Sequence, residues 1–201
     1  MQRFVCEQNI AHFDKLLGQA TDPTLRRTLL TLLSSAKREL ALLDSQRSGA
    51  DLSPGALRRR TGNLASVLEQ LRPRFETSEQ AYMLIDPGPG LKIIDINDAY
   101  GRITFTDRHE ISGKPLFDVF PDNPAIATAD GVSNLYASLR TVVDTGQPHA
   151  MAVQRHDIRD PCGTFVERYW LAINTPVHEG DGRLLCLQSH IEDVTAEVLA
   201  N

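Results

Sequence analysis

The chain has 201 residues, of which 41% are hydrophobic and 23% charged, and its formal net charge is −5. This composition supplies enough apolar surface for a packed core and excludes wholesale disorder, and no apolar run reaches the roughly 18 residues that a membrane-spanning helix needs. The first eight residues mix Arg3, Glu7 and Gln8 with few apolar side chains, which does not resemble a secretory signal. We therefore expect a cytoplasmic protein that does not enter a membrane.

The charges and cysteines narrow the function classes further. Residues 1–80 carry 12 Lys and Arg against 9 Asp and Glu, whereas residues 81–201 carry 9 against 17. The acidic half disfavours nucleic-acid binding, because phosphate backbones repel it. The three cysteines, Cys6, Cys162 and Cys186, are far apart and have no metal-ligand spacing, so neither a disulfide framework nor a zinc site is indicated.

The first 80 residues are predicted to be helical. Apolar residues recur at three- and four-residue spacing over residues 1–50, which favours a helical hairpin whose second helix begins at Asp22 and Pro23. Residues 51–80 are predicted to form a connecting helix with one leucine stripe. Helices this short are marginal alone, so another surface must cover their stripes. We expect a homodimer through these helices, or packing against the second region.

The pattern changes at about residue 81, where strands replace helices. Two short apolar runs flank a Pro-Gly turn, short helical pieces and a longer helix follow, and three strand-like runs separated by hairpin turns close the chain. The predicted ranges are 82–86 and 91–96 for the first strands, 132–144 for the helix, and 149–159, 165–178 and 184–194 for the last strands. This order predicts an α+β domain over residues 81–195, with a five-stranded antiparallel sheet and helices on one face.

Several short motifs in this region resemble those of PAS sensory domains. They are Asn97-Asp98-Ala99-Tyr100, Ile111 to Pro115, Phe117 to Pro121, the segment Glu167 to Trp170 with Asn174 to Val177, and the final Glu192-Asp193-Val194-Thr195. The Asp-Val-Thr sequence is similar to the exit that links many PAS domains to an outgoing helix, which we expect to start at residues 196–201. The resemblance to a bacterial signalling subgroup covers residues 81–195 and implies a sensory function.

Three polar residues are candidates for transmitting a signal through the domain. Asn97 follows a strand and is expected to cap the next helix, and Asp193 is expected to cap a helix that starts near Val194. Thr195 belongs to the same exit motif. We weigh capping above any chemical role for these side chains, so their contribution would be mechanical.

The domain carries more large side chains than a sheet of this size needs, which predicts either a filled core or a pocket for a small ligand. The two alternatives are evenly balanced. The candidate ligand-binding residues are Tyr100, Phe105, Phe117, Phe120, Leu135, Leu139, Met151, Arg155, His156, Arg168, Trp170 and Asn174. The polar members of this set would orient the ligand.

Strand alternation places His156 with Gln154 and opposite Met151 and Arg155, but it does not say which face is inward. A surface or rim position is favoured over ligand contact for His156, and equally for His190. The identity of a cofactor stays unknown. The resemblance argues against haem, because haem-binding PAS domains commonly place their ligand on the helix that corresponds to 132–144, which has no His here. It also argues against covalent flavin, because the light-sensing PAS subgroup uses a cysteine after the second strand, and no cysteine lies between Cys6 and Cys162.

The functional hypothesis is a non-enzymatic sensor. It would be the sensor portion of a bacterial two-component system, such as a histidine kinase, that binds a small molecule or a protein output partner and signals through helical dimer contacts. The alternative is a small α+β enzyme with a conical, isomerase-like pocket. That enzyme would need an isolated inward Asp or Glu with a raised pKa, which the strands do not clearly offer.

Overall fold

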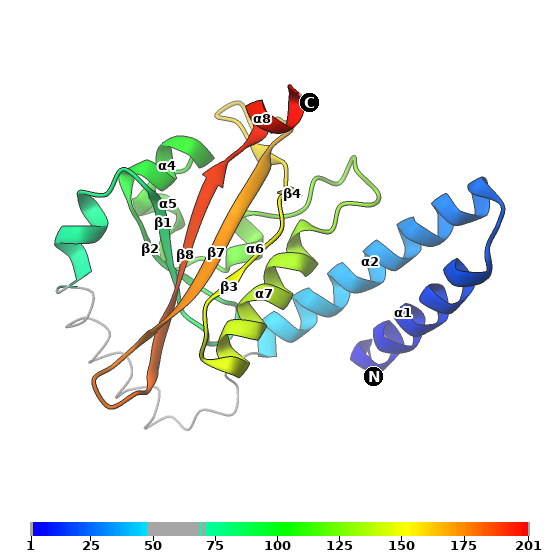
Figure 1. The fold of residues 1–201 in the computed structure, drawn as a ribbon, viewed down its shortest axis with the longest axis horizontal. Coiled ribbons are helices and arrows are strands. Elements are labelled where there is room, and N and C mark those ends of the chain that lie inside the picture. Colours follow the sequence, from blue (N-terminus) through cyan, green and yellow to red (C-terminus); the bar gives the residue numbers. More distant parts are fainter. Residues whose placement is uncertain (1, 48–68, 70, 201) are drawn as a thin grey trace.

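The leucine patterns at the start of the chain form two antiparallel helices, α1 (Gln2–Gln19) and α2 (Pro23–Arg47). Asp22 marks the start of α2 as predicted, since its carboxylate accepts a hydrogen bond of 2.7 Å from Leu25 N. The structure is a computed structural model that describes residues 2–47, 69 and 71–200 (Figure 1). The predicted connecting helix over 51–80 lies outside the described residues up to residue 68, and residues 71–76 are helical.

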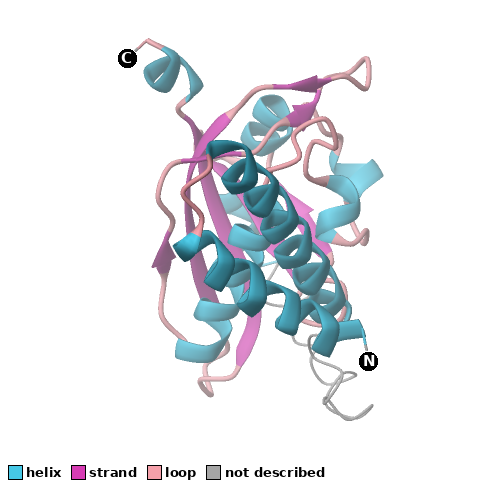
Figure 2. Ribbon diagram, turned by 90° about the vertical axis from the view of Figure 1, so that its right-hand side faces the viewer, coloured by secondary structure: helices cyan, strands magenta, loops and turns pink. Residues whose placement is uncertain are grey.

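The hairpin is docked on the rest of the molecule through α2. Helix α2 lies between α1 and α7 (Gly131–Thr145) (Figure 1), and Figure 2 shows the two hairpin helices in front of the sheet. Ala41 is buried in the main hydrophobic core together with α7 residues, and Gly90 N donates a 2.8 Å hydrogen bond to Ser45 O near the end of α2. The hairpin keeps several large apolar side chains exposed, namely Phe4, Val5, Leu25, Leu30 and Leu32.

The second region contains the predicted antiparallel sheet. The strand order is β2-β1-β8-β7-β3, with β4 also paired to β7. The strands are β1 (Ala81–Ile85), β2 (Ile93–Ile96), β3 (His149–Ala150), β4 (Gln154–Arg155), β7 (Tyr169–His178) and β8 (Leu184–Asp193). Because β3 and β4 share one edge beside β7, the sheet has the five strand positions that the sequence predicts, and the α+β fold is confirmed.

The third predicted strand run, 149–159, is not one strand. Its last part, β5 (Ile158–Arg159), leaves the sheet and pairs with β6 (Phe165–Val166) as a separate ribbon. Asp160 closes this ribbon, because its carboxylate accepts hydrogen bonds from Cys162 N and Thr164 N, and Gly163 has a φ of 82° that favours glycine. The departure directs buried Ile158 into the main core.

Short helices cover one face of the sheet. They are α4 (Asp98–Thr104), α5 (Arg108–Ile111) and α6 (Leu116–Val119), followed by α7, and α8 (Thr195–Leu199) leaves the domain at its end. None of the helices in the described part of the chain has the length and apolar character needed to cross a membrane.

Alternation along the two long central strands decides which side chains meet these helices. Trp170, Ala172 and Asn174 of β7 are buried on the inner face, and β8 contributes Leu187 and Ser189 to it. On the outer face, Leu84 and Cys186 pack with Phe75 in a second, smaller cluster. The inner face therefore holds most of the core, and a binding site of the domain is expected on the same face.

Asn97 joins the start of the sheet to α4. Its buried side chain accepts hydrogen bonds of 3.0 Å from Tyr82 N and Tyr100 N, and it donates to Gln80 O and Phe75 O. The predicted cap of α4 is thus present, and the same amide also satisfies backbone groups on the segment that leads into β1.

Replacement of this amide should be costly. We expect Asn97→Ala to lower the free energy of unfolding by about 3 kcal/mol, because it removes a helix cap and leaves buried backbone groups unpaired. Asp98→Asn, at the exposed neighbouring position, should change it by at most about 0.5 kcal/mol. Urea denaturation would measure both values, and equal losses in the two variants would contradict the central role of Asn97.

Candidate functional site

A cavity lies between the inner face of the sheet and the covering helices. Its lining is mostly apolar, with a few polar side chains from the edge strand and β8. The lining residues are Met83, Tyr100, Thr104, Phe120, Gly131, Leu135, Gln154, His156, Ile158, Trp170, Ala172, Ser189 and Ile191. The cavity has a volume of about 60 Å³ and opens to solvent. This volume holds about four waters, so a ligand of one ring would extend into the opening.

The cavity exists because small residues stand where large ones would fill it. Ala172 and Ser189 face it from the two central strands, and Gly131 faces it from the start of α7. A Cβ at Gly131 would lie 2.0 Å from His156 Nδ1, so only glycine lets the imidazole pack against this helix end. The larger neighbours Trp170 and Tyr100 form walls; burial raises the pKa of the Tyr100 phenol, which therefore stays protonated.

His156 is the most notable polar group of the lining. Its side chain is 11% exposed, and Nδ1 lies 4.0 Å from Asp122 Oδ1. Nε2 is buried without a hydrogen-bond partner. Burial lowers the pKa of the imidazole, with the carboxylate of Asp122 acting in the opposite direction, so the ring is neutral at neutral pH. An unpaired buried nitrogen of this kind is costly unless something bonds to it.

Two amides on the inner face have unpaired oxygens as well. Gln154 donates from Nε2 to the sulfur of Met151 at 3.5 Å, while its buried Oε1 has no partner. Asn174 donates 2.8 Å to Ser138 Oγ, and its Oδ1 is also unpaired. Gln154 lines the cavity, whereas Asn174 is fully buried outside its lining, so the inner face contains hydrogen-bond acceptors that lack donors.

Behind His156, Asp122 connects three elements. Its side chain is 3% exposed; Oδ1 accepts 3.0 Å from Val132 N at the start of α7, and Oδ2 accepts 2.5 Å from Arg38 Nε on α2. Arg38 also donates 2.6 Å to Ala129 O. The carboxylate thus anchors the helical hairpin next to the wall of the cavity.

The structure separates the predicted ligand-binding residues into two groups. Tyr100, Phe120, Leu135, His156 and Trp170 line the cavity. Phe117 and Leu139 are core residues, Asn174 is buried outside the lining, Met151 lies in a surface groove beside α7, and Arg155 pairs with Asp157 at 2.8 Å. Phe105 is 43% exposed. His156, for which the sequence favours a surface or rim position, is half-buried, and its side chain is 11% exposed.

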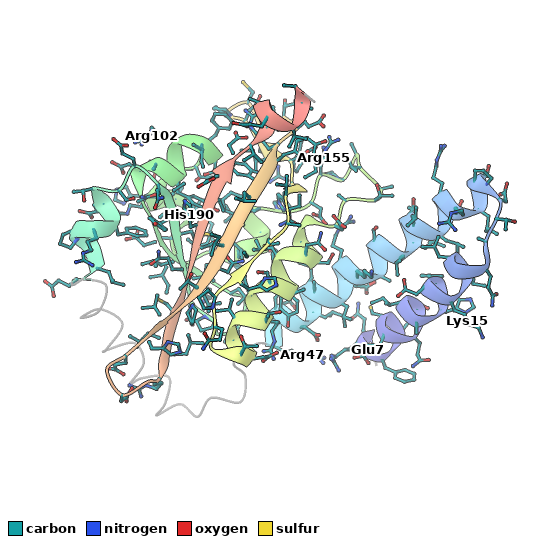
Figure 3. All side chains as sticks on the ribbon, viewed as in Figure 1. Glu7, Lys15, Arg47, Arg102, Arg155 and His190 are labelled. Carbon is teal, nitrogen blue, oxygen red and sulfur yellow. The ribbon has the colours of Figure 1, made fainter. Side chains whose placement is uncertain are left out.

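Arg155 and a further histidine considered in the sequence analysis, His190, lie away from the cavity lining. His190, labelled on β8 in Figure 3, is on the outer face against the ring of Tyr82, with centroids 5.1 Å apart. Arg155, also labelled there, ends the edge strand β4. The sequence did not indicate Gly131, Ser189 or Gln154 as lining residues, although strand alternation with Leu187 and Trp170 could have suggested the last two.

The exit motif ties the end of β8 to β7. Asp193 accepts a 3.0 Å hydrogen bond from Thr195 N, and Thr195 Oγ1 accepts 2.9 Å from Tyr169 N. Arg168 pairs with Asp193 at 3.2 Å and lies over the ring of Phe105. The N-cap of α8 is Val194, which makes no side-chain cap bond, so Asp193 does not occupy the predicted cap position, and the signalling role of this junction stays a prediction.

Comparison with known proteins identifies relatives of this arrangement. A family model described as "PAS fold" matches residues 75–199. A variant of the light-oxygen-voltage protein RsLOV is 18% identical over 65% of this chain and 69% of its own, with a TM-score of 0.51. The PAS domain of a Colwellia psychrerythraea protein is 13% identical over 65% of this chain and 98% of its own (TM-score 0.48). That of the fruit-fly ELK potassium channel is 14% identical over 64% and 97% (TM-score 0.48). A search of curated proteins found no match.

The buried imidazole should make stability depend on pH. Because the native pKa of His156 lies below its ordinary value of 6.5, the unfolded chain binds a proton that the native state does not. As far as His156 contributes, the free energy of unfolding is therefore highest above about pH 6.5, and it decreases as the pH falls toward the native pKa. Urea denaturation between about pH 7.5 and 5 should show this slope, and His156→Gln should flatten it. His109→Gln, at an exposed position of α5, should keep the slope; an unchanged slope in H156Q would contradict the assignment.

Proposed function

The chain belongs to the PAS family, which serves sensory signalling, and on that premise we propose that it is a non-enzymatic sensor of a small molecule in a bacterial signal-transduction system. The observation that carries the ligand part is the cavity with the unpaired acceptors of His156 and Gln154 on its wall. Apolar cavities with a few convergent polar groups are typical of small-molecule sites. The output would be a histidine kinase or another protein partner.

The chemistry of the lining limits the ligand. When the His156 proton is on Nδ1, the nitrogen nearer Asp122, Nε2 accepts a hydrogen bond, as does Gln154 Oε1. No charged side chain that would balance an ionic ligand belongs to the lining among the described residues. A neutral molecule of about one ring, carrying hydroxyl or N–H donors, therefore fits best. Its apolar part would contact Trp170 and Leu135.

The alternative, an isomerase-like enzyme, would need a carboxylate in the cavity. Among the described residues, no Asp or Glu lines it, and the nearest buried carboxylate, Asp122, is engaged by Arg38 and Val132 N. The sensory proposal is therefore favoured.

Transmission would use both ends of the domain. The exit bonds of Asp193 and Thr195 lead into α8, toward an output partner. At the other end, α1 and α2 expose Phe4, Leu25 and Leu32, and a second copy of the chain would cover them. We infer a cytoplasmic homodimer in which ligand binding changes the helical contacts.

Ligand binding can be followed with Trp170, the single tryptophan of the chain, which lines the cavity. We expect phenol and related neutral hydroxylated rings to change its fluorescence saturably. Ala172→Leu should abolish the change, because the longer side chain occupies the cavity, at a cost of about 1–3 kcal/mol in stability.

The matched control is Ala150→Leu, the same change at an exposed position of β3. This variant should bind as the unmodified chain does. Equal binding by A172L and A150L, with circular dichroism showing both folded, would place the ligand outside the cavity and contradict the proposal.

The proposed homodimer can be tested separately, by its mass in solution. Size-exclusion chromatography with light scattering should give twice the chain mass of 22.3 kDa, and the double variant Leu25→Glu/Leu32→Glu should give the monomer mass, because charges would be buried in the contact. Thr24→Glu/Gln46→Glu adds the same charge at exposed polar positions of α2 outside the stripe of Leu25 and Leu32 and should remain dimeric. A monomeric chain at high micromolar concentration would disprove the dimer.

A further inference from the structure

The strongest unexplained feature is the position of Asp122 between the cavity wall and the helical hairpin. The hairpin precedes the PAS domain, and none of its described residues, 2–47, lines the cavity. Even so, its Arg38 bonds to a carboxylate whose other oxygen lies 4.0 Å from the imidazole of a lining residue, His156. Asp122 thus lies next to both the hairpin and a residue of the cavity lining.

Arg38 attaches the hairpin to the PAS domain through specific hydrogen bonds. Arg38 Nε bonds to Asp122 and Nη2 bonds to Ala129 O, so the guanidinium holds both the carboxylate and the loop that leads into α7. The arginine side chain is 25% exposed and the carboxylate 3%. Charge-assisted bonds at such a partly buried site are stronger than surface pairs and less screened by solvent.

The position of His156 would let it respond to an occupant of the cavity. The ring packs against Gly131, at the helix end whose next residue, Val132, donates its N–H to Asp122. Its Nε2 is buried without a hydrogen-bond partner, its Nδ1 lies 4.0 Å from Asp122 Oδ1, and the ring also bonds to the backbone of Phe120. A change at one nitrogen alters the other, because the two share one ring and one tautomeric equilibrium.

We propose that Arg38, Asp122 and His156 form a relay that couples the cavity to the docking of the N-terminal hairpin, so that an occupant bonded to His156 shifts Asp122 and changes how firmly α2 is held. The signalling role rests on the proposed function, whereas the coupling itself is a property of the ligand-free chain. The relay sends the signal toward the N-terminal helices, away from the exit at Asp193.

The physical basis is that one carboxylate serves several donors. Asp122 Oδ1 already accepts from Val132 N, and a ring that moves or gains charge next to it competes with Arg38 for the same anion. The other charged groups that act on His156 are Asp130 and Asp157. Asp157 is paired with Arg155, which leaves Asp122 as the nearest carboxylate and the one that contacts α2.

The first experiment is hydrogen exchange of the ligand-free full chain, followed by mass spectrometry. His156→Gln should speed exchange of the backbone amides of α2 about three- to tenfold, the scale on which coupling residues shift an equilibrium, although His156 lies in the link between β4 and β5 and does not itself bond to α2. The matched control is His190→Gln, which replaces another histidine whose buried Nε2 has no hydrogen bond, on the opposite face of the sheet. H190Q should leave α2 unchanged.

The second experiment tests the relay from the other end and does not depend on how well H156Q folds. Arg38→Gln removes the cation beside Asp122, so the carboxylate should act more strongly on the imidazole and raise the pKa of His156 in an NMR titration. Arg3→Gln breaks a hairpin ion pair with Asp44 instead and should leave that titration unchanged. In the double variant R38Q/H156Q, the exchange of α2 should equal that of R38Q alone.

Each result decides the proposal. Faster α2 exchange in H156Q together with a shifted His156 titration in R38Q supports the relay. Unchanged α2 exchange in a folded H156Q, or an unchanged titration in R38Q, overturns it. Either outcome is independent of whether phenol binds the cavity, so loss of the relay and loss of the ligand proposal are distinguished.

Discussion

The rest of the structure depends on one constraint, which is that the inner face of the curved sheet must be covered. The β7 and β8 strands send Trp170, Ala172 and Ser189 to the same side, and the register pairs Ala172 with Ile191 and Asn174 with Ser189. Short helices, which cannot follow a twisted sheet closely, supply the cover. Where small residues meet the helix start at Gly131, the cover is incomplete, and the cavity results.

The unfilled space has a cost in stability that packing elsewhere must offset. A cavity lacks contacts on one side of every lining atom, and buried acceptors without donors add to the loss. His156, Gln154 and Asn174 nevertheless have buried acceptors without donors, although apolar residues of similar size would cost less stability. Local rules are most often broken where a protein binds something, so this pattern agrees with the sensory proposal.

Much of this fold could be predicted from the sequence, because strand alternation and helix periodicity are local signals. The antiparallel order of the sheet, the hairpin of α1 and α2 and the cap at Asn97 follow from short segments. The departure of β5 was missed, since residues 149–159 form one continuous apolar-polar pattern. The candidate site was predicted only in part: large residues such as Trp170 were found, but Gly131 and Ser189, which create space, were not. The sequence pattern does not indicate Asp122 as a site residue, because its partner Arg38 is 84 residues away in the chain.

The burial of the pair between Asp122 and Arg38 has a consequence for the environment in which the hairpin works. Mobile ions screen exposed charges over about 8 Å at physiological ionic strength, but they act weakly on a carboxylate that is 3% exposed. The contribution of this pair to the attachment of α2 should consequently depend only weakly on salt concentration. The docking of the helices would then depend on the interior of the fold more than on the salt concentration of the surrounding solution.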